Sequence, residues 1–388
     1  MSDSILIVGA SVRAAAFSAL AAGLRPVCGD LFADADLAAR AAVTAVRPYP
    51  AGFVDFARTA PPGPWMYTGA LENEPELVDR ISRNRPLLGN SGEVLKRVRD
   101  PVGVHRTLVR AGLVAPECRA TSAGLPRNGT WLCKPLKSSG GRRVHLMDAE
   151  TAIDRRDFAC YFQQRIEGLA CAAVYLAADG ESRLLGVTEQ LLRSAHPREP
   201  KFCYSGSMGP LRLSEQAAAT FDLIGRVLSG EFELQGIFGV DAVLAGETVW
   251  PVEVNPRYTA SVEVVERALG ISVVDLHVAA CRDRQLPSIV EIPIISPSSG
   301  KWFGKQILFA TADIEITPRF TEQALRHNRR PEQPEVADIP RPGTRLTVGQ
   351  PVLTVLAHGD SDAEMRQMLN DRSRQWADLL YAGTSAAQ

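Results

Sequence analysis

The 388-residue sequence lacks several features that would place it in a broad class of protein. No apolar run approaches the roughly 20 residues that a helix needs to cross a bilayer. The N-terminal segment MSDSILIVGA has neither the basic region nor the cleavage site of a signal peptide. The formal net charge is only −1, from 43 basic and 44 acidic residues, so no strong field attracts nucleic acid or an anionic membrane. We therefore expect a cytoplasmic protein without a nucleic-acid or membrane partner.

The cysteines also lack an informative pattern. Seven cysteines are scattered along the chain, their number is odd, and no two form a C-x-x-C pair. The sequence therefore predicts neither a disulfide framework nor a zinc site. Buried, inert thiols are the expected state.

What the sequence does contain is a distinctive segment at residues 235–258, QGIFGVDAVLAGETVWPVEVNPRY. It is rich in Val, Ile, Phe and Trp on both sides of Ala245-Gly246-Glu247, which predicts two strands joined as a hairpin. A three-residue loop would pair Leu244 with Thr248. A two-residue loop would turn one strand's side chains to the opposite face.

The three-residue loop determines which polar side chains of the hairpin share a face. Glu253 and Asn255 are two residues apart, so on a strand they point the same way. With this loop Asp241 lies opposite Pro251 and joins Glu253 and Asn255 on that face. Two carboxylates and an amide oxygen are then gathered together, with Arg257 just beyond.

Hard cations such as Mg²⁺ prefer oxygen ligands and bind through one or two carboxylates together with substrate phosphates. The segment resembles the metal-binding hairpin of the ATP-grasp superfamily, in which an acidic residue on one strand precedes Glu-x-Asn-Pro-Arg on the next. The resemblance implies that Asp241, Glu253 and Asn255 hold Mg²⁺, or Mn²⁺ in its place, against the phosphates of ATP. It also implies that Arg257 is a catalytic residue that holds the transferred group. A solvated hairpin face with ordinary surface charges is the alternative.

A second candidate is the strand 130–135, TWLCKP, which ends in Lys134-Pro135. A lysine at the end of a buried strand is costly unless its ammonium meets an anion, and phosphate is the obvious anion. The resemblance gives Lys134 a catalytic and nucleotide-binding role at the α- and β-phosphates. Adjacent glycines can point successive backbone N–H groups at one anion. This predicts a phosphate lid formed by Ser138, Ser139, Gly140 and Gly141.

Further nucleotide contacts follow from the resemblance. Residues 159–168 are similar to the family's hinge strand, which assigns the adenine contacts to Gln163, Gln164, Arg165 and Ile166. The family often has Asp-Lys where this chain has Asp100-Pro101, so the nucleotide-binding lysine is assigned to Lys96, with Arg97 as the alternative. Leu169 and Ala170 stand where many members carry an acidic residue for the ribose, so that contact has no candidate.

The acceptor side of the site is assigned to the segment that follows residue 200. By comparison with relatives, the substrate contacts are Lys201, Tyr204, Ser207 and, from the hairpin, Arg257. A surface loop is the alternative for the first three. Glu263 follows the hairpin, and we expect a surface acid there, with a substrate contact as the alternative.

The predicted fold class is α/β (α+β), in three domains. Residues 1–92 form a doubly wound parallel α/β domain that begins with the strand ILIVGA, similar to the domain that precedes ATP-grasp domains. Residues 93–285 form a two-lobed ATP-grasp domain with a lid lobe at about 118–165. Residues 286–388 form a C-terminal β-rich module with a closing helix.

The predicted function is an ATP- and Mg²⁺-dependent ligase. It would activate a substrate carboxylate as an acyl phosphate, couple it to an amine as an amide, and release ADP and phosphate. An amino-acid ligase in cofactor or secondary-metabolite biosynthesis is one such enzyme. The expected partners are small-molecule carboxylate and amine substrates, with a homo-oligomer as a further expectation.

Other functions are compatible with the same residues. An ATP-dependent carboxylase or phosphotransferase would use the same fold, and an inactive ATP-binding regulator would use the site without turnover. An NAD-dependent oxidoreductase would need the turn at Gly9 to bind a dinucleotide, although the full G-x-G-x-x-G fingerprint is absent.

Overall fold

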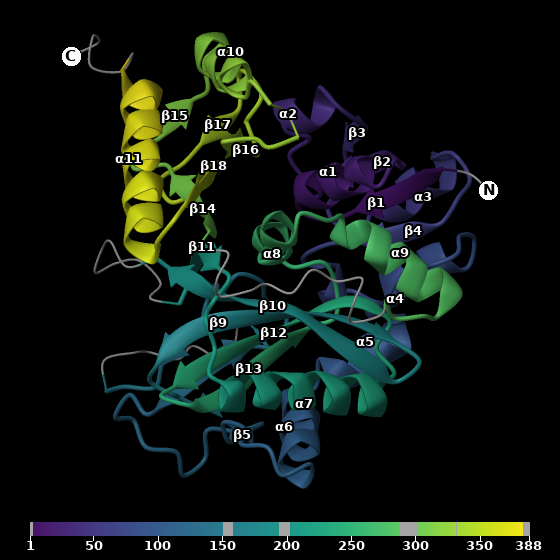
Figure 1. The fold of residues 1–388 in the computed structure, drawn as a ribbon, viewed down its shortest axis with the longest axis vertical. Helices are drawn as coiled ribbons and strands as arrows, with labels where there is room; N and C mark the ends of the chain where they lie inside the picture. The colour runs from purple at the N-terminus through teal and green to yellow at the C-terminus, as the bar shows by residue number, and fades with distance from the viewer. Residues whose placement is uncertain (1–2, 150–157, 194–201, 288–300, 331, 383–388) are drawn as a thin grey trace.

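Four parallel strands open the chain and are flanked by short helices (Figure 1). The computed structural model describes residues 3–149, 158–193, 202–287, 301–330 and 332–382. In spatial order the strands are β3 (Ala42–Ala45), β2 (Arg25–Asp30), β1 (Ser4–Val8) and β4 (Trp65–Tyr67). The helices are α1 (Arg13–Ala21), α2 (Ala35–Ala38), α3 (Phe53–Thr59), the 3-10 turn η1 (Leu71–Asn73) and α4 (Pro75–Ser82).

The turn after β1 serves packing. A Cβ on Gly9 would lie 2.0 Å from Thr68 Oγ1, so only glycine fits there. The Asp30 carboxylate is fully buried and accepts backbone N–H groups from Val12 and Ala33 at 2.8 and 2.7 Å. In a dinucleotide fold the acid after the second strand binds the ribose. Because Asp30 is already used by the backbone, this turn does not favour the NAD-dependent alternative.

The largest element is an eight-stranded antiparallel sheet. Its strands, in spatial order, are β13 (Thr248–Asn255), β12 (Gly236–Ala245), β9 (Leu169–Ala178), β10 (Glu181–Leu192), β11 (Tyr204–Gly209), β14 (Trp302–Phe309), β18 (Pro351–Gly359) and β16 (Val336–Ala337). Helix α7 (Glu215–Phe232) covers one face, and α8 (Val262–Leu269) and α9 (Val273–Asp283) lie on the other (Figure 1). Strands of the C-terminal segment therefore continue the sheet that contains the candidate metal hairpin.

Two smaller units complete the fold. A four-stranded antiparallel sheet, the lid sheet, is made of β5 (Cys118–Arg119), β8 (Cys160–Gln164), β6 (Trp131–Pro135) and β7 (His145–Leu146). It follows α5 (Gly92–Val98) and α6 (Pro101–Arg110). The C-terminal segment adds the strand pair β15 (Ile314–Glu315) and β17 (Arg345–Leu346), and helices α10 (Pro318–His327) and α11 (Asp362–Tyr381).

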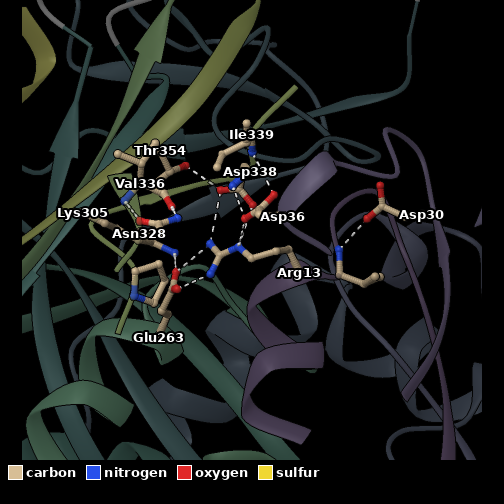
Figure 2. Close-up of polar contacts among 12 residues, drawn as sticks. Arg13, Asp30, Asp36, Glu263, Lys305, Asn328, Val336, Asp338, Ile339 and Thr354 are labelled. Atoms are coloured by element: carbon tan, nitrogen blue, oxygen red, sulfur yellow. Dashed lines mark hydrogen bonds and ion pairs between the residues drawn. The ribbon is translucent and has the colours of Figure 1, made fainter. Parts of the chain in front are cut away.

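A buried ionic network joins α1, α8 and the C-terminal strands, and we call it the junction cluster (Figure 2). The Arg13 guanidinium donates to Glu263 and to Asp338, with distances of 3.1 Å to Glu263 Oε2 and 3.0 Å to Asp338 Oδ1. Lys305 Nζ donates to the same Glu263 oxygen at 3.1 Å, and Thr354 donates to Asp338 at 2.6 Å. The expectation that Glu263 is a surface acid is wrong, because its carboxylate is buried between two cations.

The observed architecture confirms the predicted fold class, since it combines a parallel α/β sheet with a large antiparallel sheet and a smaller one. The proposed division at residues 92 and 285 stays a prediction. Among the described residues, no helix is long and apolar enough to cross a membrane.

Candidate active site

The hairpin of β12 and β13 differs from the predicted one in its turn. Ala245 pairs with Thr248, so the loop holds only Gly246 and Glu247, and Leu244 pairs with Val249. Gly246 has a φ of 61°, which suits the first central residue of a type II′ turn. The predicted three-residue loop and the pairing of Leu244 with Thr248 are therefore wrong.

A β-bulge restores the predicted face. The register shifts so that Ala242 pairs with Pro251 and Asp241 with Glu253, which leaves Val252 as the extra residue. The two-residue loop alone would turn Asp241 to the face opposite Glu253 and Asn255, and the bulge turns it back to their face. Asp241 consequently lies opposite Glu253, and Asn255 Nδ2 donates to Asp241 Oδ2 at 3.3 Å. The three predicted metal ligands share one face, for a reason that the sequence pattern does not contain.

The two carboxylates of this face differ in charge. Burial and the neighbouring Glu253 raise the pKa of Asp241 to about 7. Burial also opposes ionisation of Glu253, but Arg99 and Lys134 hold the pKa of Glu253 below its usual range. Gln190 Nε2 donates to Asp241 Oδ1 at 2.9 Å. The face thus has one ionised carboxylate beside another whose charge is opposed by its surroundings.

Lys134 lies above the same hairpin. Its ammonium donates to Gln163 Oε1 at 3.1 Å and lies 3.4 Å from the carbonyl oxygen of Val252, the bulged residue. The ammonium also lies 5.6 Å from the centre of the Tyr161 ring. Burial alone would lower the pKa of Lys134, but Tyr161 and Glu253 raise it, so the ammonium keeps its charge. The lid sheet thus presents a buried cation to the carboxylate face.

The glycine loop of the predicted lid is docked against two other parts of the chain. The Ser138 carbonyl accepts from Asn73 Nδ2 at 3.2 Å, and the Gly140 carbonyl accepts from the Tyr204 N–H at 3.1 Å. Gly140 and Gly141 have φ values of 65° and 73°, which favour glycine. A Cβ on Gly141 would lie 1.9 Å from the Phe202 carbonyl oxygen, so this loop needs glycine for close approach.

The hinge segment lies at the edge of the same space. Gln163 Nε2 donates to the Val252 carbonyl at 3.0 Å, so this side chain supports the bulge. Gln164 Oε1 accepts from the Glu117 N–H at 3.3 Å. The Arg165 N–H donates to the Thr130 carbonyl at 2.9 Å, so it is not free for a base edge. The Ile166 backbone is the better candidate for an adenine contact.

Arg257 holds an acid from the 3-10 turn η1 of the N-terminal segment. Its Nη2 donates to Glu72 Oε1 at 2.6 Å, and Glu72 is 2% exposed. The same nitrogen lies 3.4 Å from Asn255 Oδ1. Arg257 Nε and Glu72 Oε2 are both buried without a hydrogen-bond partner among the described residues. Of the two residues, Arg257 lines the cavity beside the metal face, so its unpaired donor is the one positioned for a ligand.

One cavity of about 680 Å³ joins these groups. Its lining includes the metal face, Lys134, Arg257, Tyr204, the glycine loop and the hinge residues 163–166. Its volume falls in the range of sites for small molecules and cofactors.

The oxygen donors on this face fit Mg²⁺. Within the described residues, no three His, Cys, Asp or Glu side chains are arranged to hold a metal. Two carboxylates and an amide oxygen nevertheless suit Mg²⁺, which completes its coordination with waters and phosphates. A divalent cation would also remove the repulsion that raises the pKa of Asp241.

Three predicted site residues are not placed in this cavity. Lys96 is exposed and pairs with Glu76 at 2.9 Å, so its nucleotide contact is not supported; Arg97 is also exposed and contacts the Glu231 carbonyl. Ser207 is fully buried behind Tyr204, whose hydroxyl lies 2.8 Å from Ser207 Oγ. Lys201 lies outside the described residues.

The residue that sequence reasoning missed is Arg99. Its Nη1 donates to Glu253 Oε1 at 2.6 Å, and it lines the cavity. It directly precedes Asp100-Pro101, which stands where the family often has Asp-Lys. The sequence therefore offered Arg99 as a third basic candidate beside Lys96 and Arg97.

Comparisons with known proteins match the part of the chain that contains this site. Residues 98–261 match the sequence model of an ATP-grasp domain. The formate-dependent phosphoribosylglycinamide formyltransferase of Stutzerimonas stutzeri (strain A1501) is 25% identical over 227 residues, which cover 57% of each chain. The enzyme of the same name from Histophilus somni (strain 129Pt) is 30% identical over 174 residues, 43% of each chain. This chain thus spans about half the length of the curated relatives it matches.

Two solved structures share the fold along nearly the whole chain. N5-carboxyaminoimidazole ribonucleotide synthetase, in complex with ADP, and the L-amino acid ligase from Bacillus licheniformis each have a TM-score of 0.68, with 97% of both chains covered. Their identities to this chain are 16% and 17%. Residues 98–261 therefore match an ATP-grasp domain, with a segment of the chain on either side of the match.

Proposed function

We propose that this chain is an ATP- and Mg²⁺-dependent ligase that joins a carboxylate to an amine. The observation that carries the proposal is the convergence of the Asp241–Glu253–Asn255 face, Lys134 and the glycine loop on one cavity of about 680 Å³. Each element is suited to a different part of a metal–triphosphate complex. The family match over residues 98–261 supports the same assignment.

The nucleotide would lie between the hairpin and the lid sheet. Lys134 supplies a charged ammonium for the phosphates, and the loop of residues 138–141 supplies backbone N–H groups at a close approach. The hinge around Ile166 supplies backbone groups for the base. Asp241, Glu253 and Asn255 would hold Mg²⁺, whose charge neutralises the phosphate oxygens during transfer.

Arg257 is suited to the carboxylate substrate. The carboxylate oxygen attacks the γ-phosphorus, and the bond from that phosphorus to the bridging oxygen breaks, which gives an acyl phosphate and ADP. The amine nitrogen then attacks the acyl carbon, the carbon–oxygen bond to phosphate breaks, and the amine proton leaves with phosphate or solvent. The chain provides orientation and electrostatic stabilisation, so no protein nucleophile is required. Arg257, with its unpaired Nε, can steady the acyl phosphate between the two steps.

ADP release provides the test. We expect ADP release that requires Mg²⁺ together with both a carboxylate and an amine, measured across amino acids paired with amines. Glu253→Ala should lower turnover by at least about 10³-fold while the protein stays folded. Glu247→Ala, an exposed acid in the turn of the same hairpin, is the matched control and should keep full activity.

Other outcomes would identify the alternatives. ADP release that needs bicarbonate would identify a carboxylase, and tight ATP binding without turnover on any pair would identify a regulator; either would contradict the ligase proposal. An amino acid as the carboxylate substrate and a cytoplasmic location are parts of the same proposal. A homo-oligomer stays a prediction.

A further inference from the structure

Arg99 has an unusual position for a cation at a metal site. It follows the last residue of α5 and directly precedes Asp100, whose carboxylate accepts the Val102 N–H at the start of α6. Both helix ends fix the backbone there, so the side chain is aimed at the hairpin. Its guanidinium donates to Glu253 Oε1 at 2.6 Å and to the Val254 carbonyl at 3.3 Å. The side chain is 14% exposed.

The hydrogen bonding of Arg99 is incomplete. Its Nη2 donates to Asn73 Oδ1 at 3.3 Å, but its Nε is buried without a partner among the described residues. A buried donor without a partner is costly unless another state of the molecule satisfies it. The guanidinium also borders the cavity that would hold the triphosphate. Arg99 is therefore positioned to accept a second anionic partner.

We propose that Arg99 is a placeholder for the divalent cation. In the chain without ligand, the Arg99 guanidinium neutralises Glu253. When the metal–nucleotide complex binds, the divalent cation binds the Glu253 carboxylate in its place, and the guanidinium turns to the phosphates. The exchange keeps the charge balanced in both states, so neither a bare carboxylate nor an unpaired arginine is buried. This inference rests on the proposed nucleotide site, but not on which acid and amine are joined.

Asn73 connects the placeholder to the lid. Its Oδ1 accepts from Arg99, while its Nδ2 donates to the carbonyl of Ser138 in the glycine loop at 3.2 Å. One amide therefore contacts both the cation that must move and the loop that would cover the phosphates. Asn73 is a positioning residue in this arrangement, since it acts through Arg99 and the loop.

The test is Mn²⁺ binding to the full chain without nucleotide, measured by electron paramagnetic resonance for the parent and Arg99→Met. Removal of the competing cation should tighten Mn²⁺ binding by about tenfold or more. The same variant should bind MgATP more weakly. If Arg99 only held Glu253 in position, Arg99→Met would change the Mn²⁺ affinity in the opposite direction, because the carboxylate would lose its fixed orientation and bind Mn²⁺ more weakly. Unchanged or weaker Mn²⁺ binding therefore overturns the proposal.

Two further variants protect the test. Arg97→Met removes an exposed arginine from α5, the helix that Arg99 follows, and should leave both affinities unchanged. Arg99→Lys keeps the positive charge and should therefore bind Mn²⁺ with an affinity near that of the parent. It replaces Arg99→Met if circular dichroism shows that Arg99→Met is unfolded. In that case, Mn²⁺ binding by Arg99→Lys that is about tenfold tighter than in the parent would overturn the proposal. The readout needs no turnover. If the ligase assay fails but Arg99→Met still tightens Mn²⁺ binding, the proposed ligase reaction is rejected and the proposed role of Arg99 stands.

Discussion

Two buried clusters of charge in this molecule behave in opposite ways. In the junction cluster, Arg13 and Lys305 both donate to Glu263, and although burial opposes it, they hold the pKa of Glu263 well below its usual range. On the metal face, burial and Glu253 instead raise the pKa of Asp241 to about 7. In the junction cluster two cations keep Glu263 ionised, whereas on the metal face the charge of Asp241 is opposed; Asp36, beside Arg13, resembles Asp241 instead, because burial raises its pKa to about 6.

The polar atoms show the same contrast. Among the described residues, Arg13, Glu263 and Lys305 contribute no buried side-chain polar atom without a partner, whereas Arg99, Arg257 and Glu72 each contribute one. The first cluster joins three segments of the chain, and none of its described residues lines the cavity of about 680 Å³ that the second cluster lines or adjoins. Incomplete pairing next to a cavity therefore distinguishes a candidate functional site from a structural ion network.

The largest expected effect comes from breaking the junction cluster. Arg13→Met leaves Glu263 and Asp338 without their main cation, so we expect the free energy of unfolding to fall by about 3–5 kcal/mol. Urea denaturation at pH 7 measures the change. Arg326→Met removes an exposed helical pair with Glu322 and should leave stability almost unchanged. A loss of less than about 1 kcal/mol in Arg13→Met would show that the cluster is not a structural junction.

Removal of the lid cation should act on binding. Lys134→Met should weaken nucleotide binding by about 10- to 100-fold, because it removes the buried ammonium from the phosphate position. Isothermal titration calorimetry with MgATP measures the effect. Lys137→Met is the control, because Lys137 is 66% exposed and pairs with Glu74. Equal affinities for the two variants would remove Lys134 from the site.

On the metal face, a substitution should stabilise the protein. Asp241→Asn removes one of two facing carboxylates, so in EDTA at pH 8 we expect the free energy of unfolding to rise by about 1 kcal/mol. Thermal denaturation of the parent, this variant and the exposed Asp371→Asn measures it. A destabilised Asp241→Asn would mean that this face is satisfied without metal, as the junction cluster is.

Acid titration should separate the clusters further. The pKa of Glu263 is depressed in the folded state, so its contribution to stability is present above its ordinary pKa of about 4.3 and is lost as pH falls below that value. Glu263→Gln has no carboxylate to protonate, so it does not show this loss. Between about pH 4.3 and 2, the free energy of unfolding should fall less steeply in the variant than in the parent, and the two slopes should differ by about 1 kcal/mol per pH unit. Identical slopes would contradict the depressed pKa.

The smallest effect is expected at Lys96. Its ammonium is exposed and pairs with Glu76, so Lys96→Ala should change MgATP affinity by less than about twofold. The same calorimetric titration measures it. A loss as large as that expected for Lys134→Met would restore Lys96 to the nucleotide site.

Local patterns predicted much of this molecule. The apolar run at Ile5 to Ala10 indicated a parallel strand, and the spacing of Glu253 and Asn255 placed them on one face. The hairpin loop was predicted wrongly, and the bulge at Val252 was not predicted, because its carbonyl contacts Gln163 and Lys134 from two strands of the distant lid sheet. Correct placement of Asp241 depended on two compensating changes of register.

Long-range partners could not be predicted from one sequence. Arg99 meets Glu253 across 154 residues, and Arg13 meets Glu263 across 250. Periodicity and spacing describe neighbours along the chain and say nothing about such pairs. From the sequence, Glu263 was therefore expected to be a surface acid, and the nucleotide-binding cation was assigned to Lys96 and not to Arg99. Buried ion pairs become visible only when the tertiary structure brings both partners together.

ATP binding with and without Mg²⁺, measured by calorimetry for the parent and Glu253→Gln, tests the metal face most directly. We expect Mg²⁺ to strengthen ATP binding to the parent by about tenfold or more, and the gain to disappear in Glu253→Gln. If Mg²⁺ gives the parent no gain, or gives the variant the same gain, the hairpin does not bind the metal–nucleotide complex and the proposed site is wrong.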